Sequence, residues 1–351
     1  MNINLLTEAE LSQLRSYIAA AADIVVIGHV NPDGDAIGST LAWANYLNKE
    51  GKNVRVIVPD KYPDFLNWLP NTDKILRHDK HKEEAESLVA SADLLFCLDL
   101  NTLSRTSTLA EHIMAAKATK VLIDHHLNPD VPCQLTISWP GMCSTCEIVF
   151  RLVWQLGAFD NLGAQFAVPC YCGMMTDTGG FTFNSTRPEI FFIISQLLTK
   201  GIDKDRIYRN VFNVASEYKM RLWGYVLYEK MQYDPLRHAS YYTLTREDLE
   251  RFHYIKGDAE GLVNMPLQIK GTKLSISLRE DTDRDNIIWV SLRSVDDFPC
   301  NKMAAEFFNG GGHLNASGGR LDCSIEKAVE ITRKAIEKYE TYMRPSARQR
   351  E

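Results

Sequence analysis

The sequence has no long apolar run, and its first residues include no basic cluster. None of its apolar stretches approaches the roughly 20 uncharged residues that a membrane-spanning helix needs. The first residues include Glu8 and Glu10 without an early cluster of lysine or arginine, which is unlike a secretory signal peptide. We therefore expect a soluble protein with no membrane partner and a cytoplasmic location.

Positive charge is also scarce. The chain has 39 lysine and arginine residues against 45 aspartate and glutamate residues, which gives a formal net charge of −6. A protein that follows long nucleic acid displaces counterions with a basic groove, and this balance offers none. The charge argues against long duplex nucleic acid as a partner. It is compatible with small phosphorylated ligands held by a few local arginines.

The eight cysteines do not have the spacing of a secreted disulfide framework. Cys143 and Cys146 form a C-x-x-C, and Cys170 and Cys172 form a C-x-C. A structural zinc site is one interpretation of such pairs. The alternative is that they are small buried residues in a reducing environment. The spacing of the second pair, with Tyr171 inside it, favours the buried interpretation.

With 351 residues, the chain is long enough for two domains. In its first part, apolar runs alternate with helical patterns. Strands are expected at 24–27, 54–58, 94–98 and 121–123, and helices at 6–21 and 36–49. Residues 144–175 look helical, with interruptions at Gly157 and Pro169, and the proline should kink or divide its helix. This alternation predicts an α/β domain with a mainly parallel sheet over 1–186.

The pattern changes after residue 186. Residues 187–232 show consecutive helical patterns without a strand signal, which predicts a helical connector. Beyond it, strands are expected at 241–244, 267–269, 273–278 and 287–292, and helices at 300–308 and 325–342. These elements predict a smaller α+β domain with a mixed sheet over 233–345.

Carboxylates and histidines gather directly behind the expected strands. The segment His29-Val30-Asn31-Pro32-Asp33-Gly34-Asp35 follows the first strand, Asp99 follows 94–98, and Asp124-His125-His126 follows 121–123. A further carboxylate, Asp177, lies in a glycine-flanked loop. In an open α/β sheet, ligands bind at the carboxyl ends of the strands. The sequence therefore predicts a binding site at this edge.

The residue types point to metal. The candidate ligands are His29, Asp33, Asp35, Asp99, His125 and Asp177. Their carboxylates would balance the charge of two divalent cations, and Asp99 is the natural bridging ligand because it arrives from a neighbouring strand. Mixed imidazole and carboxylate ligation suits Mn²⁺, with Mg²⁺ or Co²⁺ as alternatives.

Each cluster alone has an ordinary structural explanation. Asp35 could cap the helix that begins at Ala36. A pair of adjacent histidines often belongs to the surface or to the core. However, ligand-bearing turns behind several successive strands are hard to explain as caps. Their order favours the metal interpretation.

These motifs, in this order, resemble those of the DHH phosphoesterase superfamily, which is named for a triad present here as Asp124-His125-His126. The resemblance implies one cation on His29, Asp33 and Asp99, and another on Asp35, Asp99, His125 and Asp177. It also implies that His126 contacts the scissile phosphate or helps to protonate the leaving oxygen. Asp124 would orient the histidines without binding metal.

The C-terminal part resembles the DHH-associated substrate-binding domain of the nuclease branch. Its marks are Arg293-Ser294, Gly310-Gly311-Gly312-His313 and Ala316-Ser317-Gly318-Gly319. Amides of a glycine run can approach a phosphate closely, and an arginine can hold one bidentately. A helix C-cap followed by a flexible turn is the alternative for the glycines. The resemblance implies substrate binding by Arg293, Ser294, Gly311, Gly312 and His313.

In similar proteins an arginine shortly after the bridging aspartate helps to bind substrate, which points to Arg105; a surface ion pair is the alternative. The best match is a cytoplasmic oligoribonuclease of the nanoRNase type. Such enzymes cleave very short RNAs to mononucleotides and often remove the 3′-phosphate of 3′-phosphoadenosine 5′-phosphate. Short RNA oligonucleotides and nucleoside bisphosphates are therefore the expected partners, and a homodimer through 187–232 is compatible with the resemblance.

Other functions stay open at this stage. A RecJ-like single-strand exonuclease shares the catalytic motifs, and so do a soluble linear or cyclic dinucleotide phosphodiesterase and a manganese-type pyrophosphatase. Outside the enzymes, a nucleotide sensor could keep the fold without catalysis. A sensor would be expected to lack part of the ligand set, whereas every expected ligand is present.

Overall fold

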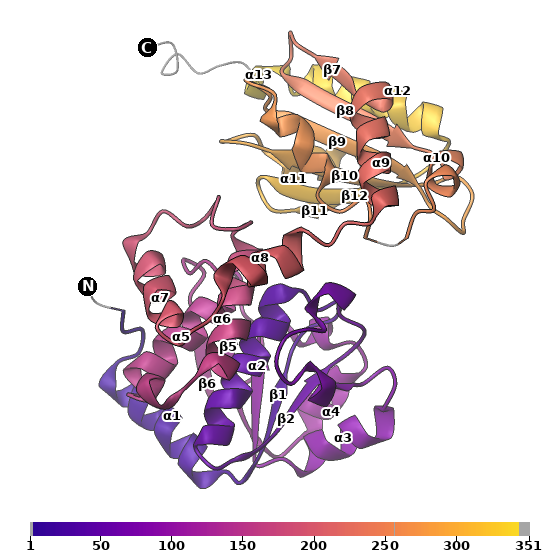
Figure 1. Cartoon of the computed structure of the whole chain (residues 1–351). Coiled ribbons are helices and arrows are strands. Elements are labelled where there is room, and N and C mark those ends of the chain that lie inside the picture. The colour runs from indigo at the N-terminus through magenta and orange to yellow at the C-terminus, as the bar shows by residue number, and fades with distance from the viewer. Residues whose placement is uncertain (1–2, 256, 344–351) are drawn as a thin grey trace. The chain divides into compact units, whose positions relative to one another are not determined.

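The computed structural model describes residues 3–255 and 257–343, and the chain forms two compact units (Figure 1). The first unit ends at Val214 and the second begins at Ala215, so the boundary falls inside the predicted connector of 187–232. The helices of that segment are divided between the units. The first unit contains α7 (Pro188–Leu198) and α8 (Lys204–Phe212), and the second contains α9 (Glu217–Tyr225) and a π-helix (Val226–Lys230).

The first unit is built on a parallel six-stranded sheet with the order β3-β2-β1-β4-β5-β6. The predicted strands are confirmed as β1 (Asp23–Ile27), β2 (Asn53–Val58), β4 (Leu94–Leu98) and β5 (Thr119–Asp124). The strands β3 (Leu76–Arg77) and β6 (Leu135–Ser138) were not predicted, because they are short and lack a long apolar run. From β1 the chain continues to β2 and β3 on one side of the sheet, and from β4 it continues to β5 and β6 on the other side. The junction of β1 and β4 is therefore the switch point where such sheets bind ligands.

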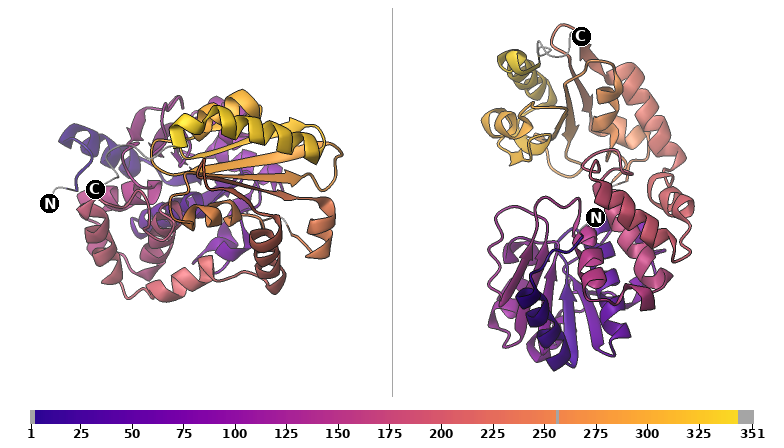
Figure 2. Two further views of the ribbon diagram at one scale, coloured as in Figure 1. Left: turned by 90° about the horizontal axis from the view of Figure 1, so that it is seen from above. Right: turned by 90° about the vertical axis from the view of Figure 1, so that its left-hand side faces the viewer.

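Helices cover both faces of this sheet, because alternate strand residues are buried on opposite sides. Val25, Ile27 and Leu95 share a core with α3 (Lys82–Ser91) and α4 (Leu109–Ala115). On the other face, Ile24, Val26 and Phe96 share a core with the remaining helices. These are α1 (Glu8–Ala20), α2 (Gly34–Lys49), α5 (Thr145–Gln155), α6 (Ala164–Asp177), α7 and α8. The layers can be followed in Figure 2.

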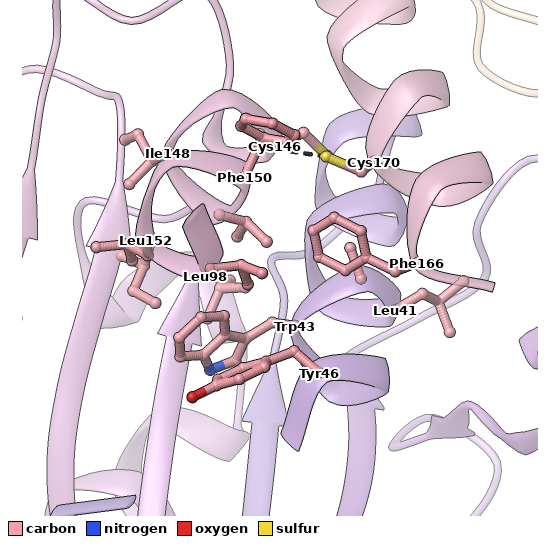
Figure 3. Packing of buried hydrophobic residues seen from close by; sticks show 14 of the residues in the cluster. Leu41, Trp43, Tyr46, Leu98, Cys146, Ile148, Phe150, Leu152, Phe166 and Cys170 are labelled. Carbon is pink, nitrogen blue, oxygen red and sulfur yellow. Dashed lines mark hydrogen bonds between the residues drawn. The ribbon is translucent and has the colours of Figure 1, made fainter. Parts of the chain in front are cut away.

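Aromatic and sulfur-containing side chains fill the core beneath α2, α5 and α6 (Figure 3). Trp43 is fully buried, and its ring centroid lies 5.2 Å from that of Phe96. The Cys170 thiol donates to the carbonyl oxygen of Cys146 at 3.4 Å. The cysteines of both short pairs are buried, and no cluster of potential metal ligands within 3–255 and 257–343 includes a cysteine. The pairs therefore belong to the core, as the buried interpretation holds.

Glycines let α2 and α6 approach closely. A Cβ atom added to Gly38 of α2 would lie 2.5 Å from the carbonyl oxygen of Pro169, and one added to Gly34 would overlap the side chain of Thr176. Of the two outcomes expected for Pro169, a kink or a division of its helix, the division does not occur, since Pro169 lies inside α6. Packing against α2 outweighs the hydrogen bond that the proline removes.

The second unit contains a mixed six-stranded sheet with the order β11-β12-β10-β9-β8-β7, which confirms the predicted α+β class. Its strands are β7 (Gln232–Asp234), β8 (Ala239–Leu244), β9 (Leu274–Glu280), β10 (Ile287–Ser294), β11 (Gly311–Gly312) and β12 (Ala316–Asp322). Only β8 and β9 pair in parallel. Residues 344 and 345 of the predicted range 233–345 lie outside the described residues.

Helices lie on both sides of this second sheet (Figure 2). One core includes α11 (Cys300–Phe307), α12 (Ile325–Lys338) and α13 (Glu340–Met343), and the other includes α9 and α10 (Arg246–Arg251). Among the described residues, no helix in either unit has the length and apolar character that crossing a membrane requires.

One strand prediction in the second unit is wrong. The strand expected at 267–269 overlaps a 3-10 helix, Leu262–Gln268, which contains Pro266 and so lacks a ladder donor at that position. Gly311 and Gly312 form β11 and pair with β12. A Cβ atom on Gly310 would overlap the Gly318 backbone, so the glycines here allow two chain segments to touch.

Gly38→Ala should lower the melting temperature of the protein. In an unobstructed helix interior, alanine is about 0.5–1 kcal/mol more favourable than glycine. At position 38, however, the new methyl group would meet the Pro169 carbonyl oxygen at 2.5 Å. Overpacking of this kind costs about 1–3 kcal/mol, so the net change should be destabilising in thermal unfolding.

The matched control is Gly224→Ala in α9. No atom lies within 4 Å of a Cβ added to Gly224, so this substitution should be neutral or stabilising. Equal stabilisation by the two substitutions would show that α2 and α6 do not need a glycine at their contact.

Candidate metal centre

Three neighbouring strands deliver the central residues of the site. His29 follows β1, Asp99 directly follows β4, and Asp124 ends β5. The three strands are aligned in register. Ile24 of β1 pairs with Leu94 of β4, and the following residue pairs keep this register up to the strand ends. The residues that follow them therefore lie at one edge of the sheet, beside the junction of β1 and β4.

Asp33 caps α2 and faces His29. One carboxylate oxygen, Oδ1, accepts hydrogen bonds from the amides of Asp35 and Ala36 at 3.0 Å each. The other, Oδ2, lies 3.9 Å from Nε2 of His29. Asp33 thus fills the N-cap position that we had considered for Asp35, and the cap geometry turns its free oxygen toward the histidine.

Asp35 is fully buried in the first turn of α2, where the N-terminus of α5 holds its carboxylate. Its Oδ2 accepts from the Thr145 amide at 2.6 Å, and its Oδ1 accepts from the Cys146 amide at 2.9 Å. A helix N-terminus offers unpaired amides and partial positive charge to an anion. Even so, burial and repulsion from Asp99 raise the pKa of Asp35 to about 7.

Asp99 lies at the centre of the cluster. Its Oδ2 is 3.3 Å from Nε2 of His29, and its Oδ1 is 3.5 Å from Nε2 of His125. The Thr145 hydroxyl donates to the same Oδ1 at 2.9 Å. Burial favours the neutral form, but the hydrogen bond and charge of His29 outweigh it and lower the pKa of Asp99 to about 2.

The backbone at Asp99 is left-handed, with φ of +61°. Aspartate tolerates this region better than most residues, and such conformations gather at functional sites. The two oxygens of Asp99 face different histidines, which is the arrangement of a carboxylate shared between two ligand groups.

Backbone carbonyls orient two of the histidines. Nδ1 of His29 donates to the carbonyl oxygen of Val30 at 2.7 Å, and Nδ1 of His125 donates to that of Met142 at 3.4 Å. Because Nδ1 donates to a carbonyl oxygen, Nε2 is the ring nitrogen that faces the carboxylates, which is the nitrogen left for metal in such histidines. Burial lowers the pKa of both rings, but attraction to the nearby carboxylates, Asp99 among them, outweighs it and raises both values.

Asp177 is the last residue of α6, whereas the sequence placed it in a loop. Its Oδ2 lies 3.3 Å from Nε2 of His125. Burial and then repulsion from Asp35 and Asp99 raise its pKa well above the ordinary value. The glycine contact between α2 and α6 holds the helix end that carries Asp177 against the start of α2.

The site fits divalent cations. Potential ligand atoms fall into three groups, each within 4.8 Å: His29, Asp33 and Asp99; Asp35, His125 and Asp177; Asp99, His125 and His126. The structure therefore brings together all the candidate ligands that the sequence suggested. Carboxylate oxygens and imidazole nitrogens suit Mn²⁺, Mg²⁺ or Co²⁺. Cations would also relieve the crowding that raises the carboxylate pKa values.

His126 is held between Asp124 and Arg105. Its Nδ1 donates to Oδ1 of Asp124 at 2.8 Å, and its Nε2 lies 3.2 Å from Nη1 of Arg105. Because an arginine only donates, Nε2 is the acceptor and the proton resides on Nδ1. Arg105 comes from a 3-10 helix, Leu103–Thr106, and also donates to the Asp99 carbonyl oxygen at 3.3 Å. Asp124 thus fixes the ring of His126, and Arg105 belongs to the site.

The candidate substrate residues of the second unit lie in and beside its sheet. Arg293 is half-buried near the end of β10, and its Nη1 donates to the Leu292 carbonyl oxygen at 2.9 Å. Gly311, Gly312 and His313 are exposed. Ser294 is buried, and its hydroxyl donates to the Phe298 carbonyl oxygen at 3.0 Å and accepts from Asn315 at 2.9 Å. The Ser294 hydroxyl therefore both donates and accepts a hydrogen bond within the second unit.

Sequence reasoning missed Thr145. Its amide and hydroxyl bind two different carboxylates of the cluster, Asp35 and Asp99. A signal existed, because Ser144 and Glu147 have the spacing of a capping box, and the Ser144 hydroxyl accepts from the Glu147 amide at 3.1 Å. That pattern marks the start of a helix, but it does not reveal what the helix start faces.

Comparison with known proteins places the chain in a family. Residues 23–174 match the model described as "DHH family, N-terminal domain". A crystal structure described as an exopolyphosphatase-related protein from Bacteroides fragilis is 48% identical, with a TM-score of 0.92. The match covers 96% of this chain and 99% of that one. The chain belongs to the DHH family and is a metal-dependent phosphoesterase.

Curated relatives indicate the range of substrates within this family. The bifunctional oligoribonuclease and PAP phosphatase NrnA of Thermus thermophilus is 27% identical over 340 residues, which is 91% of each chain. The cyclic-di-AMP phosphodiesterase PdeA of Listeria monocytogenes is 24% identical over 93% of this chain, but the match spans only 49% of that protein.

Thr145→Val should weaken cation binding. Valine has nearly the same shape but cannot donate to Asp99, and loss of one hydrogen bond to a ligand typically lowers metal affinity about 10–100-fold. Calorimetric titration with Mn²⁺ measures the change. Thr145→Ser is the control, because it keeps the hydroxyl. Equal affinities in the valine variant and the wild type would show that the hydroxyl does not support the site.

Proposed function

We propose that this protein hydrolyses very short oligoribonucleotides to mononucleotides and converts 3′-phosphoadenosine 5′-phosphate to AMP in the cytoplasm. One observation carries the proposal: the potential metal ligands gather around Asp99, whose Oδ2 lies 3.3 Å from Nε2 of His29 and whose Oδ1 lies 3.5 Å from Nε2 of His125. The similarity along 91% of the chain to a bifunctional oligoribonuclease and PAP phosphatase supports this choice of substrates.

In this proposal His29, Asp33 and Asp99 hold one cation, and Asp35, Asp99, His125 and Asp177 hold the other. We propose Mn²⁺ because both groups mix imidazole with carboxylate. When bound, two such cations supply the positive charge and Lewis acidity that favour attack of water on a phosphoryl group.

The chain's own residues would bind and orient the phosphate. The Arg105 fork suits a phosphate, and it reaches the site beside Asp99. When Arg105 turns to the substrate, Nε2 of His126 is released from its present donor. After taking a proton from water, Nε2 can donate it to the scissile phosphate or to the leaving oxygen. Asp124 keeps the ring in place through Nδ1. We therefore assign Asp99, His126 and Asp124 to the reaction.

The second unit would supply substrate selection. We propose that Arg293 and His313 contact the nucleotide and that the amides of Gly311 and Gly312 approach a phosphate. Gly311 is suited to this, because it is exposed and nothing lies within 4 Å of a Cβ placed on it. Ser294 would contribute by fixing the turn that follows Arg293, through its bonds to Phe298 and Asn315.

A cyclic dinucleotide phosphodiesterase is the second candidate. It is favoured by the similarity of PdeA over 93% of this chain. Both reactions cleave a phosphodiester with water, so the two candidates differ in the substrate that is selected and not in the metal chemistry.

A substrate panel with Mn²⁺ separates the candidates. We expect rapid release of AMP from pApA and from 3′-phosphoadenosine 5′-phosphate, and little product from a 20-residue RNA, pyrophosphate or cyclic di-AMP. Chelation of the metal should abolish all activity. Faster cleavage of cyclic di-AMP would favour the second candidate, and activity confined to long RNA or to pyrophosphate would contradict the assignment of the second unit.

Asp99→Asn should remove turnover while leaving the fold intact. Asparagine has nearly the same shape and also tolerates the left-handed backbone found here. It lacks the charge shared by both ligand groups, so we expect a loss of at least about 10²–10³-fold in kcat. AMP release measures the rate, and thermal unfolding checks the fold. A folded variant with most of its activity would contradict the shared role of Asp99.

A further inference from the structure

A buried carboxylate outside the ligand set lies behind the metal centre. Glu147, in the first turn of α5, is fully buried. Its Oε1 accepts from Nε and Nη2 of Arg151 at 2.9 and 2.8 Å. Its Oε2 accepts from Nη2 of Arg187 at 2.6 Å and from the Cys143 amide at 2.8 Å. Both oxygens are thus fully used by donors.

These donors come from separate segments of the chain. Arg151 lies one turn further along α5, Cys143 belongs to the loop before α5, and Arg187 occupies the N-cap position of α7. Burial raises the pKa of Glu147, but the Cys143 amide and the two arginines outweigh it, so the pKa is lowered. An ionised carboxylate therefore ties three segments together.

The loop before α5 orients one of the ligands. Its Met142 carbonyl accepts the Nδ1 proton of His125, which turns Nε2 of that ring toward the carboxylates. Glu147 anchors this loop at the next residue, Cys143. Arg187, held by Glu147, also lies 3.4 Å from the sulfur of Met142. The position of the Met142 carbonyl thus depends on Glu147.

The start of α5 holds two further ligands. The amides of Thr145 and Cys146 bind Asp35, and the Thr145 hydroxyl binds Asp99. Glu147 is the next residue of the same helical turn, and its pairing with Arg151 and Arg187 fixes that turn in the core. A shift of this turn would move the donors away from Asp35.

Two ligands of the other group have separate supports, whereas Asp99, which both groups share in the proposed function, is bound by the Thr145 hydroxyl. His29 is oriented by the Val30 carbonyl oxygen, and Asp33 is oriented by its own cap on α2. Among the described residues, neither support contacts Glu147. A disturbance at Glu147 should therefore act on one ligand group more than on the other.

We propose that Glu147 is a positioning residue for the group formed by Asp35, His125 and Asp177. It acts through the Met142 carbonyl and the first amides of α5, and it touches neither substrate nor cation. This inference rests on the two-cation centre of the proposed function.

Titration with Mn²⁺ tests the inference on the full chain. Free Mn²⁺ gives a six-line signal in electron paramagnetic resonance, so bound and free metal can be counted without an activity assay. The variant is Glu147→Gln, which keeps the size of the side chain but replaces one acceptor oxygen by a donor amide. We expect one of two Mn²⁺ sites to weaken about 10–100-fold and the other to keep its affinity.

The matched control is a substitution at another glutamate that is largely buried. Glu86 of α3 accepts from His78 at 3.2 Å, has Nε2 of His112 at 3.2 Å, and lies on the opposite face of the sheet from α5. Glu86→Gln should leave both Mn²⁺ affinities unchanged. Arg187→Met is a second variant that releases Met142 but leaves the pair of Glu147 and Arg151 in place. It should weaken the same site, and it replaces Glu147→Gln if that variant does not fold.

The outcomes separate the two proposals. Fewer than two Mn²⁺ sites in the wild type would overturn the two-cation centre itself. Two sites in the wild type, with unchanged or equally weakened sites in the folded variants, would overturn the role of Glu147 and leave the centre standing. Selective weakening of one site in a variant that melts as a folded protein supports the positioning role.

Discussion

Like charges must be held close together at one end of a parallel sheet, and much of the first unit serves this requirement. The carboxylates of Asp35 and Asp99 are buried there, and the partly exposed carboxylate of Asp177 lies beside them. Burial and mutual repulsion act against such an arrangement in the absence of cations. The surrounding elements therefore have to supply positive potential and rigid geometry at the same place.

Several parts of the fold meet this requirement together. The amides at the start of α5 bind Asp35, and carbonyl acceptors select the ring nitrogen that two histidines present. The glycines between α2 and α6 bring two helix ends together without side chains in the way. Glu147 pairs with Arg151 of α5 and with Arg187 at the start of α7, which links these two helices. Each support is ordinary alone, but all act on the same few atoms.

The sequence was sufficient for the features that depend on local pattern. Apolar runs of 94–98 and 121–123 identified strands, and the residues directly after them identified the ligands. The sequence was insufficient for the features that tertiary packing determines. Pro169 stays inside a helix because α2 packs against it, and Asp177 ends that helix when the glycines around it suggested a loop. Asp99, which binds the Thr145 hydroxyl, and Arg187, which binds Glu147, lie far from them along the chain, where no local pattern reaches.

The proposed distribution of roles between the units has an evolutionary consequence. Every residue assigned to the cations lies before Val214, whereas Arg293, Gly311, Gly312 and His313 lie after Ala215. Substitutions in the later unit can then accumulate without disturbing the buried carboxylates. Related proteins that share the first unit can then differ in substrate specificity. The same metal site can be inherited unchanged by enzymes that hydrolyse different phosphate esters.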